Sequence, residues 1–169
     1  MEQEERLAFL GEVRLFSETL DPDELATLAG KAQVVSYPAG ATLMEAGDFG
    51  TAMYAVVEGR VDVRLADDQG HTREVATLGR AQIVGEMSLM TGARRSATVV
   101  ALGDVTAMEI SKVALEEMLA AAPQLIDRFA LVLTERRAEL DRIAAELHGD
   151  EGGDVAARIR RFFGHVFGG

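Results

Sequence analysis

The residues with the clearest chemistry lie in one short segment, residues 84–99. Gly85 and Glu86 open a run that predicts one short helical turn, and Arg95 follows this turn, just before a β-prone run. The start of a helix leaves backbone N–H groups free for an anion, and an arginine can close on the same anion with its forked guanidinium. A carboxylate repels phosphate but accepts from a sugar hydroxyl, so Glu86 favours a ribose beside the anion. The segment therefore predicts a site for a nucleotide's ribose phosphate.

This segment resembles the phosphate-binding cassette of cyclic nucleotide-binding domains. The family pattern is roughly Gly-Glu-apolar-small-apolar, a short loop, and then Arg-(Ser/Thr/Ala)-Ala-(Thr/Ser)-Val. Here the two halves are Gly85-Glu86-Met87-Ser88-Leu89 and Arg95-Ser96-Ala97-Thr98-Val99. Both are present in the right order and at the right spacing, which makes the match specific. The resemblance implies reversible binding of cAMP, cGMP or both, without catalysis and without a metal or further cofactor.

The resemblance also implies a role for each cassette residue. Arg95 binds the exocyclic oxygens of the cyclic phosphate, and Glu86 accepts from the ribose 2′-hydroxyl. Ser96 bonds the phosphate and can also reach the guanine of cGMP. Backbone N–H groups come from three further residues, Gly85, Met87 and Ser88. The sequence does not choose between the two nucleotides.

One departure from the family pattern stands beside Arg95. Many relatives carry proline immediately before the arginine, whereas this chain has Arg94. Loss of the proline loosens the loop, while a second positive charge enriches the site. The register with the Ser96-Ala97-Thr98 run favours Arg95 over Arg94 as the phosphate ligand.

A long helix after Pro123 is expected to act as a lid over the ligand. Apolar residues recur there at three- and four-residue steps as far as Leu147. The Glu-Arg-Arg triplet centred on Arg136 resembles one in prokaryotic cyclic nucleotide-gated channels, which implies that Arg136 faces the base. Because Arg136 falls on the apolar stripe, the alternative is a snorkelling side chain or an ion pair along the helix.

The elements that must position these residues predict a mainly β fold with flanking helices. Glycines recur through residues 33–110 at the spacing of a small all-β roll. We expect an antiparallel, jelly-roll-like β-roll with N-terminal helices, a short phosphate-binding helix and two C-terminal helices. The same architecture follows from the resemblance, which covers about residues 14–147. The expected strands are 33–37, 42–45, 53–58, 60–65, 73–78, 96–101 and 105–110.

We expect the chain to divide into four regions, as follows. Residues 1–31 are helical, residues 32–110 form the roll that carries the cassette, residues 111–148 form the hinge and lid helices, and residues 149–169 form a flexible linker with a basic and aromatic tail.

Local patterns predict how some of these elements begin and face. Ser17 or Asp21 begins the second N-terminal helix, and Ser111 caps the first C-terminal one. In strand 60–65, the apolar residues Val61, Val63 and Leu65 alternate with charged ones, so we expect this strand to have one buried face.

Composition narrows the function classes further. The 169 residues include no cysteine and three histidines without ligand spacing, and the formal net charge is −11. These features argue against disulfides, thiol catalysis, a metal site and a nucleic-acid surface. The longest uncharged run, residues 32–44, is too short to span a membrane, and the acidic N-terminus does not read as a signal peptide. We therefore expect a cytoplasmic location.

These observations favour the cytosolic sensor of a bacterial ion channel, whose transmembrane portion would lie outside this chain. The tail resembles the endings of bacterial mechanosensitive-type channels that carry such a domain. The main alternative is a degenerate roll that serves protein interaction or oligomerisation without nucleotide, and a homo-oligomer is compatible with either function. A transcription factor would need a helix-turn-helix after the long helix, and a cupin-like enzyme would need a histidine cluster.

Overall fold

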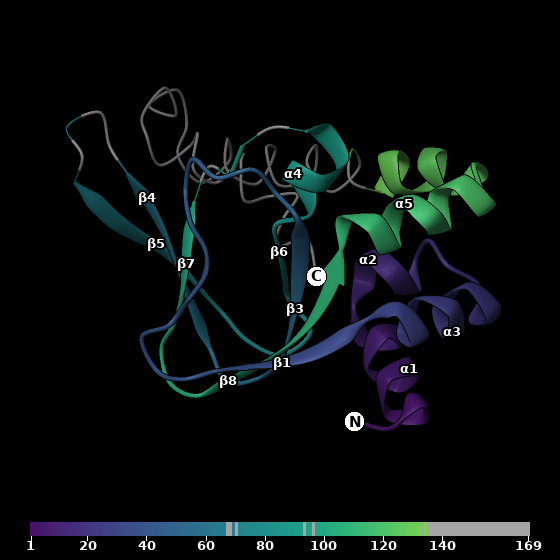
Figure 1. The fold of residues 1–169 in the computed structure, drawn as a ribbon, viewed down its shortest axis with the longest axis horizontal. Helices are drawn as coiled ribbons and strands as arrows, with labels where there is room; N and C mark the ends of the chain where they lie inside the picture. The colour runs from purple at the N-terminus through teal and green to yellow at the C-terminus, as the bar shows by residue number, and fades with distance from the viewer. Residues whose placement is uncertain (67–68, 70, 93, 96, 133, 135–169) are drawn as a thin grey trace, which may run out of the picture.

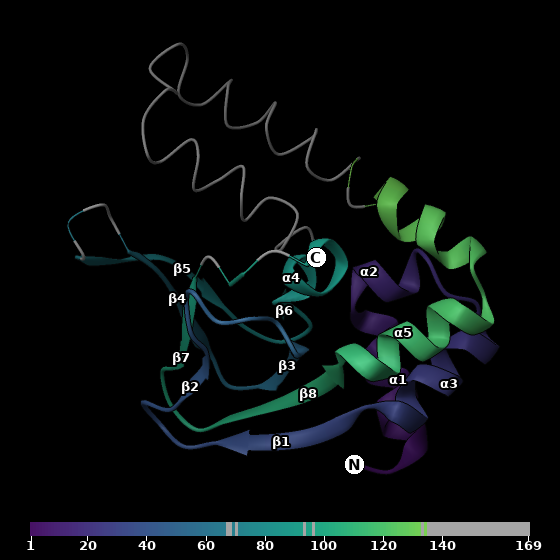
Figure 2. The same cartoon turned by 45° about the horizontal axis from the view of Figure 1, so that its top comes forward.

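In the computed structural model, two four-stranded antiparallel sheets face each other, and helices cover the outer face of one of them (Figures 1 and 2). The structure describes residues 1–66, 69, 71–92, 94–95, 97–132 and 134. The strands are β1 (Gln33–Tyr37), β2 (Thr42–Met44), β3 (Ala52–Glu58), β4 (Val61–Ala66), β5 (Thr72–Leu78), β6 (Ile83–Val84), β7 (Thr98–Ala101) and β8 (Val105–Ser111). The helices are α1 (Gln3–Glu12), α2 (Arg14–Ser17), α3 (Pro22–Lys31), α4 (Glu86–Thr91) and α5 (Lys112–Ala121). A further helical segment follows at residues 124–132.

The sheets have the strand orders β1-β8-β3-β6 and β2-β7-β4-β5, and every neighbouring pair is antiparallel. This arrangement confirms the predicted antiparallel β-roll with N-terminal helices, a short helix within the roll and helices after it. All seven predicted strands are present, with ends that differ by no more than two residues. The two-residue strand β6 was not predicted, because so short a run has no alternation to reveal it.

Strand β3 connects two hydrophobic cores. Its residues Tyr54 and Val56 face the core between the sheets, whereas Met53 and Ala55 face a second core beneath the helices. The helical core also contains Phe9, Phe16, Met108, Ile110 and Leu125, which are all almost fully buried. Because β3 is covered on both faces, nearly every residue of it is apolar, and the roll and the helices form one packed unit.

Capping residues define where α3 and α5 begin. Asp21 accepts from the Glu24 backbone N–H at 2.8 Å, and the Glu24 side chain accepts from the Asp21 N–H at 2.9 Å, which completes a capping box. Of the two predicted starts, Asp21 is therefore correct, while Ser17 is the last residue of the unpredicted α2. Ser111 caps α5 as predicted, since its hydroxyl accepts from the Ala114 N–H at 3.0 Å.

Strand β4 has buried residues on both faces, whereas the sequence predicted one buried face. Asp62 is only 1% exposed, and its Oδ2 accepts from Arg64 Nε at 2.9 Å. Arg64 lies two residues further along β4, on the same face of the strand, and Val100 opposite Asp62 on β7 is buried as well. Alternation alone missed this, because the ion pair lets a carboxylate occupy a covered position.

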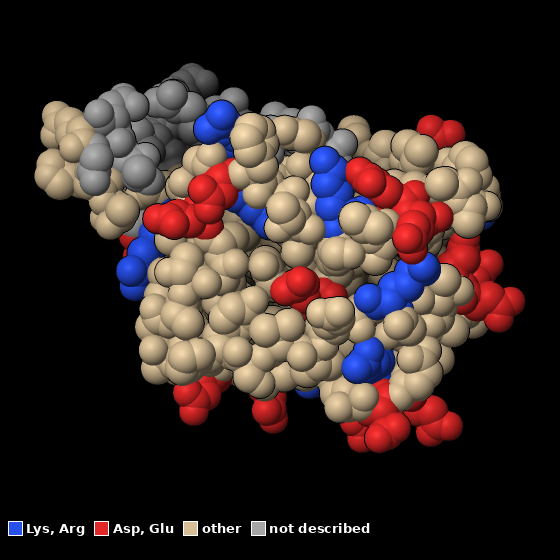
Figure 3. Space-filling view, in the orientation of Figure 1, with Lys and Arg blue, Asp and Glu red and all other residues tan. Residues whose placement is uncertain are grey.

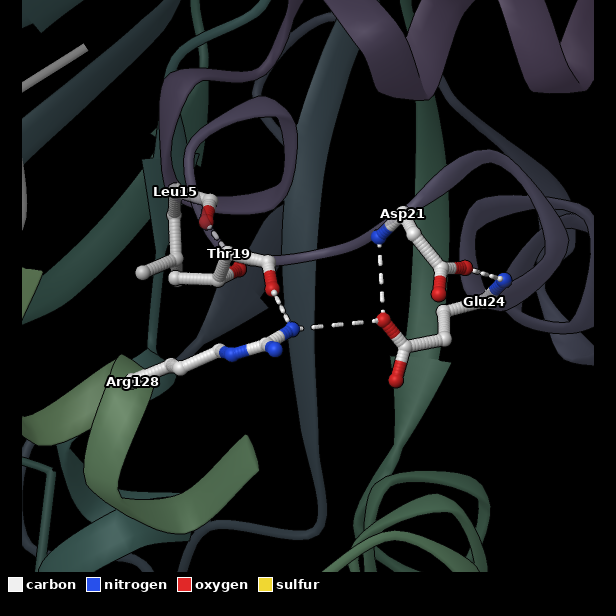
Figure 4. A network of polar contacts seen from close by, with 5 residues as sticks. All are labelled: Leu15, Thr19, Asp21, Glu24 and Arg128. Atoms are coloured by element: carbon white, nitrogen blue, oxygen red, sulfur yellow. Dashed lines mark hydrogen bonds and ion pairs between the residues drawn. The ribbon is translucent and has the colours of Figure 1, made fainter. Parts of the chain in front are cut away.

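The helical segment 124–132 packs against the N-terminal helices. Leu125 and Phe129 are buried, and the ring of Phe129 meets that of Phe16 edge-on at 6.4 Å. Figure 4 shows Arg128 of this segment donating to the backbone oxygen of Thr19 at 3.4 Å and facing the Glu24 carboxylate at 3.7 Å. The start of the predicted lid helix is thus attached to the α2–α3 corner. None of the helices that the structure describes has the length and apolar character needed to cross a bilayer.

Candidate functional site

Strand β6 and helix α4 carry the first half of the cassette. Val84 pairs with Tyr54 of β3, so the cassette starts from the edge of a sheet. Gly85 then takes a left-handed conformation (φ +88°) and serves as the N-cap of α4. Gly92, which is also left-handed (φ +74°), is the C-cap of α4, and its N–H donates to the Ser88 oxygen. Two glycines therefore let the chain turn sharply at both ends of a short helix.

Arg95 belongs to the second half of the cassette, and its side chain reaches the first half, where α4 begins. Its side chain is buried, with the residue 6% exposed. Nη1 donates to the Gly85 oxygen at 2.9 Å and to Ser88 Oγ at 2.7 Å, and Nη2 donates to the Ala52 oxygen. Ser88 Oγ in turn donates to the Gly85 oxygen at 3.1 Å. Three of the five N–H groups of a guanidinium are thus used by protein acceptors.

Two glycines make the slot that holds this guanidinium. A Cβ on Gly85 would overlap Nη1 of Arg95 and would lie 3.2 Å from the Ala52 oxygen. A Cβ on Gly50 would overlap Ser88 Oγ and would lie 2.8 Å from Ser88 Cβ. Sequence reasoning identified Gly85 but missed Gly50, because Gly50 is far from the cassette in the chain and belongs to no part of its motif.

The segment 46–50, called the 46–50 turn below, forms an unpredicted wall of the site. The Gly47 N–H donates to the Arg95 oxygen at 2.7 Å, and the Arg95 N–H donates to the Asp48 oxygen at 2.8 Å. The Ala46 N–H donates to Thr98 Oγ1 at 3.0 Å. Arg95 is therefore held at its backbone by the turn and at its side chain by the start of α4.

Glu86 is fully buried (0% exposed) at the first position of α4. Burial lowers the pKa of the Arg95 guanidinium, while Tyr54 and the carboxylates of Glu86 and Asp48 oppose this shift. The guanidinium remains charged at neutral pH because its ordinary pKa is so high. The predicted pair of a cation and a carboxylate thus shares one buried environment.

Two tyrosines lie on the inner side of the roll near this pair. The rings of Tyr37 and Tyr54 meet edge-on at 6.2 Å, and Tyr54 is buried. Burial raises the pKa of both phenols, the charge of Glu109 adds to each shift, and Arg95 partly opposes the shift of Tyr54. Neither tyrosine belongs to the cassette motif, so sequence reasoning missed them.

The structure brings four of the predicted site residues together: Gly85, Glu86, Ser88 and Arg95. Met87 belongs to α4, although the structure describes only its backbone. Ser96 and Arg136 lie outside the described residues, as do most of the lid helix and the tail. The roles implied for these seven residues toward a ligand remain predictions.

Two further observations concern nucleic acids and metal ions as ligands. On the face drawn in Figure 3, basic and acidic side chains are interspersed and form no continuous basic surface. Within the part of the chain that is described, no group of three or more His, Asp or Glu residues is placed to hold a metal ion.

Comparison with known proteins places the chain in a family. The family model for the cyclic nucleotide-binding domain matches residues 34–122, which is more than half of the chain. A CRP-like cAMP-activated global transcriptional regulator of Mycobacterium tuberculosis is 25% identical over 141 residues, covering 83% of this chain and 63% of the regulator. A cyclic nucleotide-gated potassium channel of Rhizobium etli is 35% identical over 100 residues, covering 59% of this chain and 26% of the channel.

A solved structure shares the fold. The regulatory subunit of a cAMP-independent protein kinase A from Trypanosoma cruzi, bound to guanosine, superimposes with a TM-score of 0.68 at 25% identity, covering 81% of this chain and 45% of that one. The chain thus spans less than two thirds of each of these relatives, which differ in what the whole protein does. The family match, the β-roll and the cassette geometry agree, and the chain belongs to the cyclic nucleotide-binding domain family.

Proposed function

We propose that this chain is a regulatory sensor that binds cAMP, cGMP or both at its cassette and performs no catalysis. The observation that carries the proposal is the buried Arg95 beside the buried Glu86 at the start of α4. A cation with several N–H donors suits a cyclic phosphate, and a carboxylate beside it suits the ribose 2′-hydroxyl. Backbone N–H groups of Gly85, Met87 and Ser88 complete the phosphate site, with Ser96 as a further donor.

Binding brings the ligand phosphate into competition with the acceptors that now hold the Arg95 guanidinium. In the structure its N–H groups donate to two backbone oxygens and to Ser88 Oγ, all of which are neutral acceptors. A phosphate oxygen is charged, and hydrogen bonds between two charged groups are shorter and stronger than those to neutral groups. The ligand phosphate therefore competes successfully for part of the guanidinium, and Ser88 Oγ is the one of these three acceptors that is not a backbone oxygen.

Ligand binding is transmitted to the rest of the protein by a change in position of the helices that follow the roll. Arg136 contacts the base and draws the lid helix toward the cassette. The described start of that helix is attached to the α2–α3 corner by Arg128 and by the Phe129–Phe16 contact. A ligand shifts the position of this helix only by its differential affinity for the two arrangements. In this mechanism, the position of the lid helix depends on the balance between its contacts with the α2–α3 corner and its contact with the bound ligand.

Calorimetric titration with cAMP and with cGMP tests the proposal. We expect saturable one-to-one binding of at least one nucleotide, weakened by about tenfold or more in Arg95→Ala, because a charge-assisted hydrogen bond contributes roughly 1.5–3 kcal/mol. Arg95→Lys, which keeps the charge but not the fork, should fall between the two. Thermal unfolding of each variant without ligand separates lost binding from lost folding.

Guanosine serves as the ligand without phosphate, because the structure of the Trypanosoma cruzi relative is described as bound to guanosine. If the chain binds through Arg95, guanosine binds far more weakly than cGMP, and Arg95→Ala does not change its affinity. Equal affinities for guanosine and cGMP would replace the cyclic phosphate with the nucleoside as the recognised group. If neither cyclic nucleotide nor guanosine binds, a module for protein interaction or oligomerisation explains the fold better.

We further propose that the parent protein is a ligand-modulated bacterial ion channel, with this chain as its cytosolic sensor. The support is the resemblance around Arg136 together with the 35% identity to the Rhizobium etli channel. The test is cyclic nucleotide-dependent ion flux through the full-length parent protein in lipid vesicles. Nucleotide-dependent binding of the parent to a DNA duplex, without flux, would instead assign it to the transcriptional regulators.

A further inference from the structure

Phe49 is the most exposed of the large hydrophobic residues in the described part of the chain, at 67%. Its ring is nevertheless engaged, since the guanidinium carbon of Arg94 lies 4.5 Å from the ring centroid. Arg94 Nη1 also donates to the Gly47 oxygen at 3.3 Å. Arg94 thus contacts the 46–50 turn twice, through an aromatic face and through a backbone oxygen.

This contact lies next to the backbone of Arg95. The hydrogen bonds Gly47 N–H to Arg95 O and Arg95 N–H to Asp48 O bracket Arg95, and Phe49 is the next residue of the same turn. Gly50, which follows Phe49, lies against Ser88 and the Arg95 guanidinium. Movement of the turn away from the cassette would therefore release Arg95 at its backbone and open its slot.

We propose that Phe49 and Arg94 form a clasp that keeps the 46–50 turn closed over Arg95, and that both are positioning residues for the phosphate-binding arginine. The inference rests on the proposed function. Arg94 acts on the turn rather than on the ligand, because its guanidinium is already directed to the Phe49 ring and the Gly47 oxygen. The cation that replaces the usual proline of the family thus supplies by contact the loop rigidity that the proline would supply by covalent restraint.

A double-mutant cycle separates this role from direct ligand binding. A cation–π contact at an exposed site corresponds to a factor of about two to five in the equilibrium between closed and open turn. Because only the closed turn is competent to bind, we expect Phe49→Ala and Arg94→Ala each to weaken nucleotide binding by up to this factor. The double variant should bind no more weakly than Arg94→Ala alone, because Arg94→Ala already removes both the ring contact and the hydrogen bond to the Gly47 oxygen.

A direct ligand role for Arg94 predicts the opposite pattern. Arg94→Ala would then weaken binding equally with and without the Phe49 ring, and would reduce the salt dependence of the affinity. If the aromatic face holds Arg94, Phe49→Trp should keep the wild-type affinity that Phe49→Ala loses. Arg94→Lys should keep part of the affinity that Arg94→Ala loses. Arg14→Ala controls for net charge, because it removes an exposed arginine that is far from the cassette in the sequence and pairs with Glu18, four residues further on.

Amide hydrogen exchange tests the clasp without any nucleotide. The N–H groups of Gly47 and Arg95 bridge the turn and the cassette, so their exchange should be faster in both single variants, while Arg14→Ala leaves it unchanged. If the wild-type chain binds neither nucleotide, the proposed function fails but these two amides still decide whether the clasp exists. Unchanged exchange at both amides, or additive losses of affinity in the cycle, would overturn the proposal.

Discussion

Three glycine-to-alanine substitutions test whether the guanidinium of Arg95 occupies the slot between Gly85 and Gly50. Gly92→Ala introduces a Cβ that meets no described heavy atom within 4 Å, so its only cost is the left-handed backbone (φ +74°). Gly50→Ala has no left-handed backbone but places its Cβ against Ser88. Gly85→Ala combines both, with φ +88° and a Cβ that overlaps Nη1 of Arg95.

The expected losses in free energy of unfolding follow from these geometries. A left-handed alanine costs about 1–2 kcal/mol, which is the whole effect for Gly92→Ala. Crowding of a packed site costs roughly 1–3 kcal/mol, which applies to Gly50→Ala. Gly85→Ala adds to the backbone cost the displacement of Nη1, which then loses one of its two acceptors, and a hydrogen bond to a charged group is worth about 1.5–3 kcal/mol. We therefore expect roughly 3–5 kcal/mol for Gly85→Ala.

Urea unfolding at neutral pH measures all three losses. With a slope of about 2 kcal/mol per molar urea for a domain of this size, Gly85→Ala should lower the midpoint by roughly 1.5–2.5 M. Gly92→Ala should lower it by at most about 1 M. Equal midpoints for the Gly85 and Gly92 variants would refute the slot, because the backbone cost alone would then explain both.

Three other predictions concern the contacts of Arg128 with the α2–α3 corner, the phenol of Tyr37 and the ribose of the ligand. Arg128→Ala should destabilise the chain by about 0.5–1 kcal/mol in urea unfolding, somewhat more than the exposed control Arg14→Ala, because Arg128 joins the segment 124–132 to the α2–α3 corner. An equal loss for the two variants would mean that Arg128 does not stabilise this attachment. Burial, and after it the nearby Tyr54, raises the pKa of Tyr37 above its ordinary 10.0, so the folded state keeps a proton that the unfolded state loses. Stability should therefore fall as the pH rises above about 10, and Tyr37→Phe should flatten this fall when unfolding free energies are compared across that range. Glu86→Gln should weaken cAMP binding in calorimetry but change the affinity for 2′-deoxy-cAMP little, and equal losses for both ligands would remove the ribose from its role.

Local patterns in the sequence determined much of the framework. The capping box at Asp21 and the cap at Ser111 depend on side chains within three residues of the groups they satisfy. Strand alternation and glycine spacing predicted seven of the eight strands in the described part of the chain, again from residues close together in the sequence. The order and spacing of the cassette residues, from Gly85 to Arg95, were also sufficient to predict that a carboxylate and an arginine would share one site.

Only the tertiary structure decided what surrounds that site. The 46–50 turn, Gly50 and Tyr54 reach Arg95 through contacts between segments more than thirty residues apart, and no local pattern carries that information. The burial of Asp62 likewise depends on Arg64 and on the neighbouring strand β7. Residues close in sequence constrain one another through backbone geometry, whereas residues distant in sequence meet only when the whole chain has packed, and the surroundings of Arg95 belong to the second kind.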